Sequence, residues 1–271
     1  MNAIDYISQF YDNYYEDGRL LTRPGQVEFE TTMRYIRRYL PEGARIIEIG
    51  AGTGRYSHTL ARMGYTVDAV ELVQHNIDQF IAGTAEGETV TITQGSACDL
   101  SAFPDDAYDV TLLLGLMYHL FTETDKLAAL SEAVRVTRKG GVIFAAYCMA
   151  DPSILQYGFM KGNAKMLIEK GLLDPVTFKA TSTPAELFEL HRTEDVAELR
   201  GRFNVTPLHF VAADGYANHM RETVAAMDNE TFDLFLQYHF ATCERPDMLG
   251  LSHHTLDIFK KTDDKGCPIC P

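Results

Sequence analysis

Between residues 45 and 147, short apolar runs alternate with amphipathic segments. The apolar runs have the length and β-branched character of strands, and they cover residues 45–49, 66–70, 90–93, 108–114 and 142–147. The segments between them repeat apolar residues at helical spacing over 55–63, 73–81 and 126–136. The run Tyr108-Asp-Val-Thr-Leu-Leu-Leu114 is almost continuously apolar, which is typical of a parallel strand covered on both faces. The alternation predicts a doubly wound, Rossmann-like α/β fold.

The chain on either side of this region follows other patterns. Two helices are expected first, an aromatic-rich one over residues 3–16 and a second from Phe29 to Leu40. From Asp151 to about residue 204 we expect a helical cap insertion without strands, with helices over 164–170 and 184–191. Strands at 205–211 and 254–260, with helices at 217–227 and 231–242 between them, complete a sheet of seven strands. This divides the chain into an N-terminal helical lid (1–40), a core domain (41–150 and 205–261), the cap (151–204) and a flexible tail (262–271).

Charge and composition narrow the function classes. Lys and Arg number 24 against 38 Asp and Glu, a net charge of −14, which disfavours nucleic acid and anionic membrane surfaces as partners. The sequence contains no apolar run of about 20 residues and no signal-peptide pattern, so we expect a cytoplasmic protein. We also expect it to be a monomer or a homodimer. The five cysteines are an odd number, which indicates reduced thiols. We interpret Cys267-Pro-Ile-Cys270 as part of the tail and predict no metal site.

A glycine-rich turn follows the first strand of the predicted sheet. Gly50, Gly52 and Gly54 have the spacing G-x-G-x-G, whereas a dinucleotide fingerprint needs its third glycine at position 55, which is Arg55. Glu48 lies inside the strand and directs an anion toward the floor of the expected pocket, which suits a cationic ligand group.

The second and third predicted strands also end at residues that can bind a ligand. Glu71 ends the second strand, where its carboxylate can accept both hydroxyls of a ribose. The third strand ends at Gly95-Ser-Ala-Cys-Asp99, where a carboxylate and backbone groups can recognise an adenine edge. All three signals therefore lie at the carboxyl ends of adjacent strands.

Four motifs now stand in a specific order: Glu48-Ile-Gly-Ala-Gly-Thr-Gly54, Val70-Glu71-Leu72, Ala97-Cys-Asp99, and Tyr108-Asp-Val followed by Leu114-Gly-Leu-Met-Tyr-His119. In these residues the chain resembles the class I S-adenosylmethionine-dependent methyltransferases, and among them the small-molecule group with a ubiquinone-biosynthesis-like domain. The resemblance implies S-adenosylmethionine as methyl donor, S-adenosylhomocysteine as product, a small-molecule acceptor, and a last strand that runs antiparallel to the others.

The resemblance also implies roles for single residues. Gly50 and Gly52 would line the methionine moiety, Glu71 would hold the ribose, and Leu72 would pack on the adenine. The remaining donor contacts would be Asp99 to the adenine amino group, the backbone of Ala97 and Cys98 to the ring, and Leu114, Gly115 and Leu116 beneath the sulfonium. Family members often carry an acid where this chain has Ser96. Arg55 and Tyr56 open the first helix and either face the methionine carboxylate or solvate that helix.

The residues that serve the acceptor are less constrained. His119, beside Tyr118, is the candidate general base, with a loop-anchoring role as the alternative. Tyr15 and Arg19 belong to the expected lid, and Tyr157 and Met160 of the cap are candidates for an acceptor pocket. The predicted function is methyl transfer to a small molecule. A nicotinamide-dependent oxidoreductase and a catalytically idle donor-binding protein are the alternatives.

Overall fold

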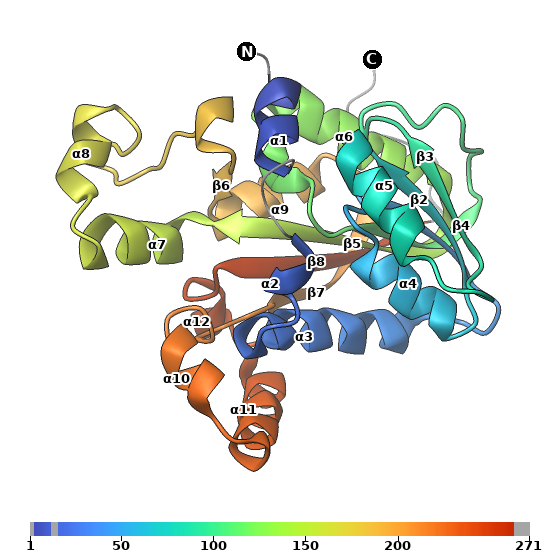
Figure 1. The fold of residues 1–271 in the computed structure, drawn as a ribbon. Helices are drawn as coiled ribbons and strands as arrows, with labels where there is room; N and C mark the ends of the chain where they lie inside the picture. Colours follow the sequence, from blue (N-terminus) through green and yellow to red (C-terminus); the bar gives the residue numbers. More distant parts are fainter. Residues whose placement is uncertain (1–2, 12–15, 263–271) are drawn as a thin grey trace.

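The computed structural model describes residues 3–11 and 16–262, which form one mixed sheet between two layers of helices (Figure 1). The sheet has the strand order β3-β2-β1-β4-β5-β8-β7, with β6 paired to β5. Its strands are β1 (Arg45–Ile49), β2 (Thr66–Glu71), β3 (Val90–Gln94), β4 (Tyr108–Leu113), β5 (Thr137–Met149), β6 (Leu190–His191), β7 (Val205–Ala212) and β8 (His254–Lys261). β8 is antiparallel to both neighbours, and the other pairings are parallel. The predicted α/β class and antiparallel last strand are confirmed.

The helices are distributed over both faces of this sheet and over its ends. They are α1 (Ala3–Tyr11), α2 (Glu16–Arg19), α3 (Arg23–Tyr39), α4 (Arg55–Arg62), α5 (Gln74–Gly83), η1 (Met117–His119), α6 (Glu123–Val136), α7 (Ala150–Ser153), η2 (Ile154–Met160), α8 (Ala164–Glu169), η3 (Pro184–Glu186), α9 (Thr193–Gly201), α10 (Arg221–Ala226), α11 (Asn229–Thr242) and α12 (Pro246–Leu249). Within the described residues, no helix has the length and apolar character needed to cross a membrane.

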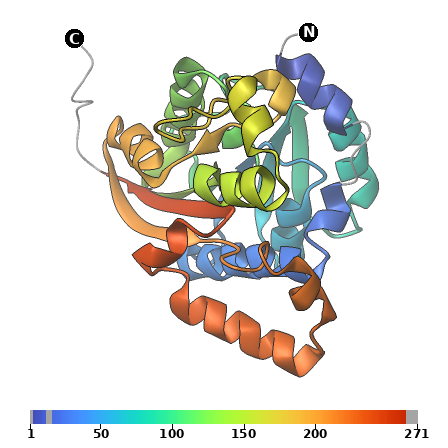
Figure 2. The same cartoon turned by 90° about the vertical axis from the view of Figure 1, so that its left-hand side faces the viewer.

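Alternating residues of β5 show how the core is split between the two faces. Phe144 belongs to a buried cluster with α3 and α4, whereas Ile143 and Ala145 belong to a second cluster with α6 and α9. Successive side chains of a strand point to opposite faces, so β5 is apolar at every position from Val142 to Met149. On the side of α3 away from the sheet, α10 and α11 pack through Val27 and Phe232 (Figure 2).

The parallel register brings the ends of three strands to one edge. Glu71 of β2 lies beside Gln94 of β3, and β1 and β4 end on the same side. In an open α/β sheet, ligands bind beyond the carboxyl ends of the strands, where the strand order reverses. Here that point lies between β1 and β4, directly after the glycine turn.

The region 151–204 differs from its prediction. The helix expected over 184–191 is wrong: a short 3-10 turn (η3) ends at Leu187, which has φ +69°, and Leu190–His191 then forms β6. β6 exists because β5 extends beyond the end of β4, which leaves the backbone of Cys148 and Met149 without a neighbour on that side, and β6 supplies it. The sheet therefore has eight strands instead of the expected seven.

Candidate active site

A cavity of about 160 Å³ lies at the carboxyl edge of the sheet, in front of β1, β2 and β4. It brings together most of the residues that the sequence singled out. Those that line it are Arg19, Glu48, Gly50, Gly52, Tyr56, Glu71, Leu72, Ala97, Leu114, Gly115, Leu116, Tyr118 and His119. We call it the first cavity.

The glycine turn forms the floor of the first cavity. Gly50 and Gly52 have φ values of +73° and +55°, a conformation that glycine adopts without strain. A Cβ at Gly50 would lie 3.0 Å from the Leu116 side chain, whereas a Cβ at Gly52 would meet nothing within 4 Å. Gly50 is therefore needed for packing, and the space beside Gly52 is open for a ligand to approach the backbone.

Glu71 is buried and held in one orientation. Its Oε1 accepts from the backbone N–H of Val73 at 2.9 Å and from Asn76 Nδ2 at 3.3 Å, and its Oε2 accepts from the backbone N–H of Gly52 at 2.8 Å. A carboxylate has about four lone-pair sites, so Oε2 retains capacity for a ligand hydroxyl. The contact with Gly52 also ties the end of β2 to the glycine turn.

Glu48 is the second carboxylate of the first cavity. The backbone N–H of Ser57 donates to its Oε2 at 2.9 Å, and the Ser57 hydroxyl donates to the same atom. Burial raises the pKa of the Glu48 carboxyl to about 7; the nearby charge of Glu71 adds to this shift, and the Ser57 hydrogen bonds oppose it. A buried carboxyl group suits a ligand that brings a positive charge.

His119 lies in η1 at the mouth of the cavity and makes two hydrogen bonds. Its Nδ1 lies 2.9 Å from the backbone carbonyl of Leu187, which can only accept, so Nδ1 carries the proton. Its Nε2 lies 2.9 Å from the hydroxyl of Tyr11, and in this tautomer Nε2 accepts. Burial lowers the pKa of His119 to about 4, so the ring is neutral at neutral pH. The contact with Leu187 also anchors the loop before β6.

A second cavity of about 330 Å³ adjoins the first. Tyr11, Arg19 and Tyr118 line both cavities, so the boundary between the cavities, which we call the junction, lies at these three side chains. The other residues around the second cavity are Phe10, Cys148, Ser153, Phe188, Leu190, His253 and His254.

Two predicted adenine contacts lie outside the first cavity. Asp99 and Cys98 are not among the residues that line it: the Asp99 side chain accepts from the backbone N–H of Ser101, and the Cys98 thiol donates to the backbone carbonyl of Asp125. Ser96 and Ala97 line the cavity instead. The turn after β3 therefore places the Ser96 side chain at the cavity, three positions before the acid that was expected there, Asp99.

The cap residues also differ from expectation. Tyr157 and Met160 line neither cavity, and their side chains are 49% and 70% exposed, because η2 directs them outward. Tyr15, Cys267 and Cys270 lie outside the described residues.

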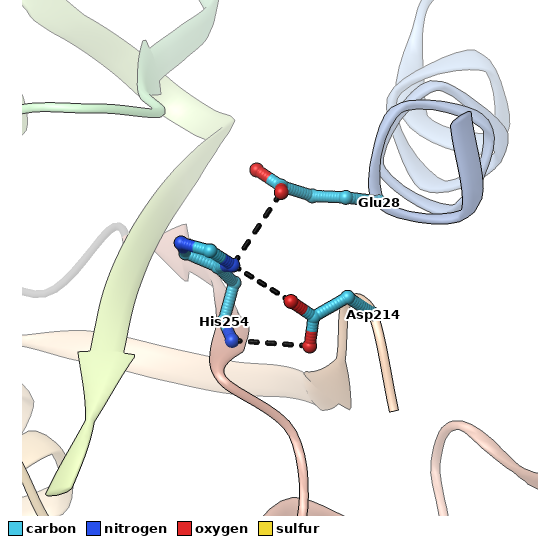
Figure 3. Close-up of side chains that lie close together, drawn as sticks. All are labelled: Glu28, Asp214 and His254. Carbon is cyan, nitrogen blue, oxygen red and sulfur yellow. Dashed lines mark hydrogen bonds and ion pairs between the residues drawn. The ribbon is translucent and has the colours of Figure 1, made fainter. Parts of the chain in front are cut away.

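Several residues at the site carried no recognisable sequence signal. Asn76 follows Glu71 by five positions and supports its carboxylate. Glu28, Asp214 and His254 form a polar cluster next to the second cavity (Figure 3). They come from α3, the loop after β7 and the start of β8, so their proximity depends on the tertiary fold.

Known proteins are similar in sequence to part of this chain. The family model for the methyltransferase domain matches residues 47–145. A ubiquinone biosynthesis O-methyltransferase from Methylobacterium nodulans is 32% identical over 111 residues, 41% of this chain and 43% of that protein. An uncharacterized protein of Mycobacterium tuberculosis is 33% identical over 103 residues, 37% of this chain and 36% of that protein. The chain thus spans less than half the length of these curated relatives.

Solved structures share the fold. A SAM-dependent methyltransferase from Methanosarcina mazei has a TM-score of 0.55 at 19% identity, over 84% of this chain and 97% of that one. A SAM-dependent methyltransferase from Thermotoga maritima has a TM-score of 0.56 at 15% identity, over 96% of this chain and all (100%) of that one. The family model and the curated relatives therefore identify residues 47–145 as a methyltransferase domain, and the solved structures show that the chain shares the fold of S-adenosylmethionine-dependent methyltransferases.

Proposed function

We propose that the protein transfers a methyl group from S-adenosylmethionine in the first cavity to a small molecule in the second. The observation that carries this proposal is that the same three side chains, Tyr11, Arg19 and Tyr118, line both cavities. A displacement reaction needs the two reactants close together, and neighbouring cavities that share lining residues are suited to this.

The residues of the first cavity fit the parts of the donor. Glu71 offers Oε2 to the ribose hydroxyls, and Glu48 offers a buried carboxylate to the ammonium of the methionine moiety. The open space beside Gly52 allows the ligand to approach the backbone closely. Ser96 and Ala97 take the place of Asp99 beside the adenine, and Tyr56 remains a candidate for the methionine end.

When bound, the donor supplies a methyl group on a positively charged sulfur, and the C–S bonding electrons stay on sulfur as a neutral thioether leaves. The protein therefore has no leaving group to protonate, and its task is to align the reactants and exclude water. Ile7 and Tyr11 bring α1 against the first cavity, which supports a lid role for α1, whereas α3 of the expected lid packs in the core against the sheet.

A proton must leave only if the acceptor atom carries one. The Tyr11 hydroxyl lies at the junction and contacts Nε2 of neutral His119, so a proton lost from the acceptor can pass through Tyr11 to that nitrogen. The low pKa of His119 makes it a weak base, which suits an acceptor that is already ionised or gives its proton to water. We therefore assign His119 and Tyr11 a positioning role first and proton transfer second.

Calorimetric titration of the full chain tests the donor assignment. S-adenosylmethionine and S-adenosylhomocysteine are expected to bind saturably, and Glu71→Ala is expected to weaken both by more than about tenfold. Binding of the oxidised nicotinamide dinucleotide instead of both sulfur nucleosides would reject the proposal. Turnover of the donor with a set of acceptors then separates an active enzyme from a protein that binds the donor without using it.

A further inference from the structure

The second cavity has an aromatic wall and a polar wall. Phe10, Tyr118 and Phe188 form the aromatic wall, with ring centroids of Phe188 at 6.0 Å from Phe10 and 5.7 Å from Tyr118. Three neighbouring strands supply its floor, because Cys148 of β5 is in register with Leu190 of β6 and His254 of β8. A volume of about 330 Å³ between such surfaces suits a ligand with one or two planar rings.

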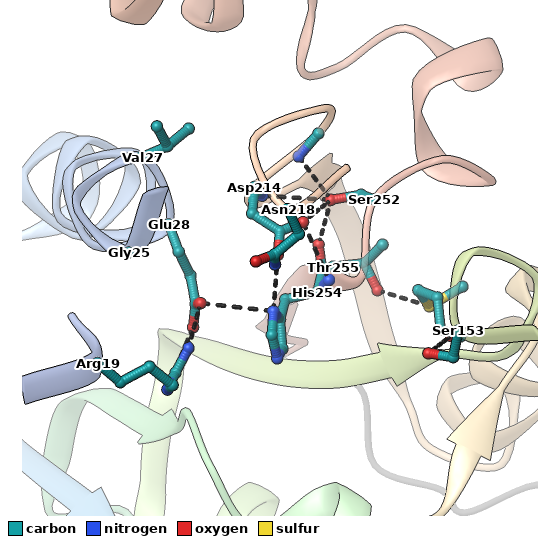
Figure 4. Close-up of polar contacts among 12 residues, drawn as sticks. Arg19, Gly25, Val27, Glu28, Ser153, Asp214, Asn218, Ser252, His254 and Thr255 are labelled. Atoms are coloured by element: carbon teal, nitrogen blue, oxygen red, sulfur yellow. Dashed lines mark hydrogen bonds and ion pairs between the residues drawn. The ribbon is translucent and has the colours of Figure 1, made fainter. Parts of the chain in front are cut away.

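The polar wall is a network of two cations and two carboxylates (Figure 4). Arg19 donates to both oxygens of Glu28, at 2.6 and 3.2 Å. Nδ1 of His254 lies 2.7 Å from Asp214 Oδ2 and 3.4 Å from Glu28 Oε2. The Ser252 hydroxyl donates to Asp214 at 2.6 Å, and Asn218 donates to the same carboxylate. The network is fixed by interactions from α3, the loop after β7 and β8.

The two cationic side chains lie nearer to the second cavity than the two carboxylates do. Arg19 and His254 line the cavity, whereas Glu28 and Asp214 stand behind them. Burial alone would lower the pKa of His254, but the charges of the Glu28 and Asp214 carboxylates hold it well above its usual value. Figure 3 shows Nε2 of His254 pointing away from both carboxylates. The adjacent His253 is neutral, because burial lowers its pKa to about 4.

A metal ion is the competing interpretation of Glu28, Asp214 and His254, whose ligand atoms lie within 4.8 Å of one another. Those atoms already serve the network: Arg19 occupies both oxygens of Glu28, and the proton of His254 Nδ1 lies between the carboxylates. A metal would have to displace the guanidinium and that proton. The contacts therefore favour a salt-bridge network with an outward-facing imidazolium.

We propose that the second cavity selects an aromatic methyl acceptor that carries a carboxylate, and that His254 is the residue that recognises this anionic group. This inference rests on the proposed function, because it names the substrate class of the same site. The aromatic wall holds the ring, His254 donates through Nε2 to the carboxylate, and Arg19 adds positive charge at the junction. The positive charge of the donor sulfur also favours an anionic acceptor beside it.

The test uses the full chain saturated with S-adenosylhomocysteine and three single-ring probes of similar size: benzoate, benzyl alcohol and benzylamine. Calorimetry is expected to show benzoate binding at least about tenfold more tightly than benzylamine, as expected for a hydrogen bond between charged groups. Tighter binding of benzylamine would overturn the inference. This comparison uses the unaltered protein and does not depend on the folding of any variant.

His254→Gln tests the assigned residue. We expect this substitution to weaken the binding of benzoate by at least about tenfold and the binding of benzyl alcohol by less than about twofold. A purely structural role of His254 would not produce such a charge-dependent difference. His209→Gln is the matched control, because His209 lies on β7 and lines neither cavity. Equal losses for both probes in His254→Gln would overturn the inference.

Two further measurements separate the possible failures. If S-adenosylhomocysteine does not bind, the proposed function fails; if it binds and benzoate does not, only the acceptor class fails. A rise in the melting temperature on addition of Mg²⁺, Mn²⁺ or Zn²⁺ that is lost in Asp214→Asn would replace the salt-bridge network by a metal site. We expect no such rise.

Discussion

The raised pKa of Glu48 predicts how donor binding changes with pH. Burial raises this pKa to about 7, so near neutral pH the carboxyl is about half protonated in the free protein. An ammonium beside it favours the ionised form and lowers the pKa by about 1–3 units, so ligand binding releases a proton. The sign follows: affinity for S-adenosylhomocysteine rises as the pH rises through the pKa of the free protein.

The magnitude follows from linkage. With pKa values of about 7 free and about 5 bound, the apparent dissociation constant falls about eightfold between about pH 6 and pH 7.5, or about 1.2 kcal/mol. Calorimetric titration at several pH values in this range measures it directly. The upper limit stays below the range in which the ligand's own amino group loses its proton.

Two controls isolate Glu48. Glu48→Gln removes the titrating group but keeps the side-chain shape, so its affinity is expected to change by less than about twofold over the same range. Methylthioadenosine lacks the amino-acid part of the ligand, and its binding to the unaltered protein is expected to be equally flat. The same eightfold dependence in Glu48→Gln, or for methylthioadenosine, would show that another group is responsible and refute the reasoning.

Three more substitutions have defined expected outcomes. Glu71→Gln is expected to weaken the binding of S-adenosylhomocysteine by at least about tenfold, as measured by calorimetry. The melting temperature of the variant shows whether it remains folded. Gly25→Ala would place a Cβ 2.0 Å from the backbone carbonyl of Arg19, so we expect a loss of about 1–3 kcal/mol in the free energy of unfolding in urea, and weaker benzoate binding. Arg200→Met leaves the buried Asp257 without its ion-pair partner, for an expected loss of about 3 kcal/mol at neutral pH. Burial already raises the pKa of Asp257 to about 6. A buried acid with a raised pKa destabilises the folded protein as the pH rises through that pKa, so the loss in the free energy of unfolding should be smaller below about pH 5 than at neutral pH. Equal losses below about pH 5 and at neutral pH would contradict this.

The strands and the glycine turn could be predicted because their signals are local. A buried strand must be apolar at nearly every position, and the turn after β1 needs positive φ at Gly50 and Gly52. The strand and the turn can therefore both be recognised from a few consecutive residues. Glu48 and Glu71 were recognisable for the same reason, since each stands at a fixed distance from a strand end. The first cavity is built mainly from such segments.

The features that were missed depend on contacts between distant segments. The two residues of β6 form a strand because β5 extends past β4, and nothing in Leu190 and His191 themselves requires it. Asp99 is a plausible adenine partner by spacing, but the tight turn after β3 points it back to Ser101. Tyr157 is an aromatic residue of the cap, but η2 directs its side chain to solvent, and it lines neither cavity. In each case the neighbouring backbone decides the direction of the side chain.

The proposed acceptor cavity lies mostly outside the part of the chain that the family model matches. The family match covers residues 47–145, which supply most of the first cavity, whereas Tyr118 apart, the residues of the second cavity come from α1, α2 and positions 148–254. Sequence similarity to known methyltransferases therefore carries information about the donor and little about the acceptor. The charged wall of Arg19 and His254 depends on segments outside the range that the family model matches, so its chemistry must be measured on this chain, and the preference for benzoate over benzylamine is the direct measure of it.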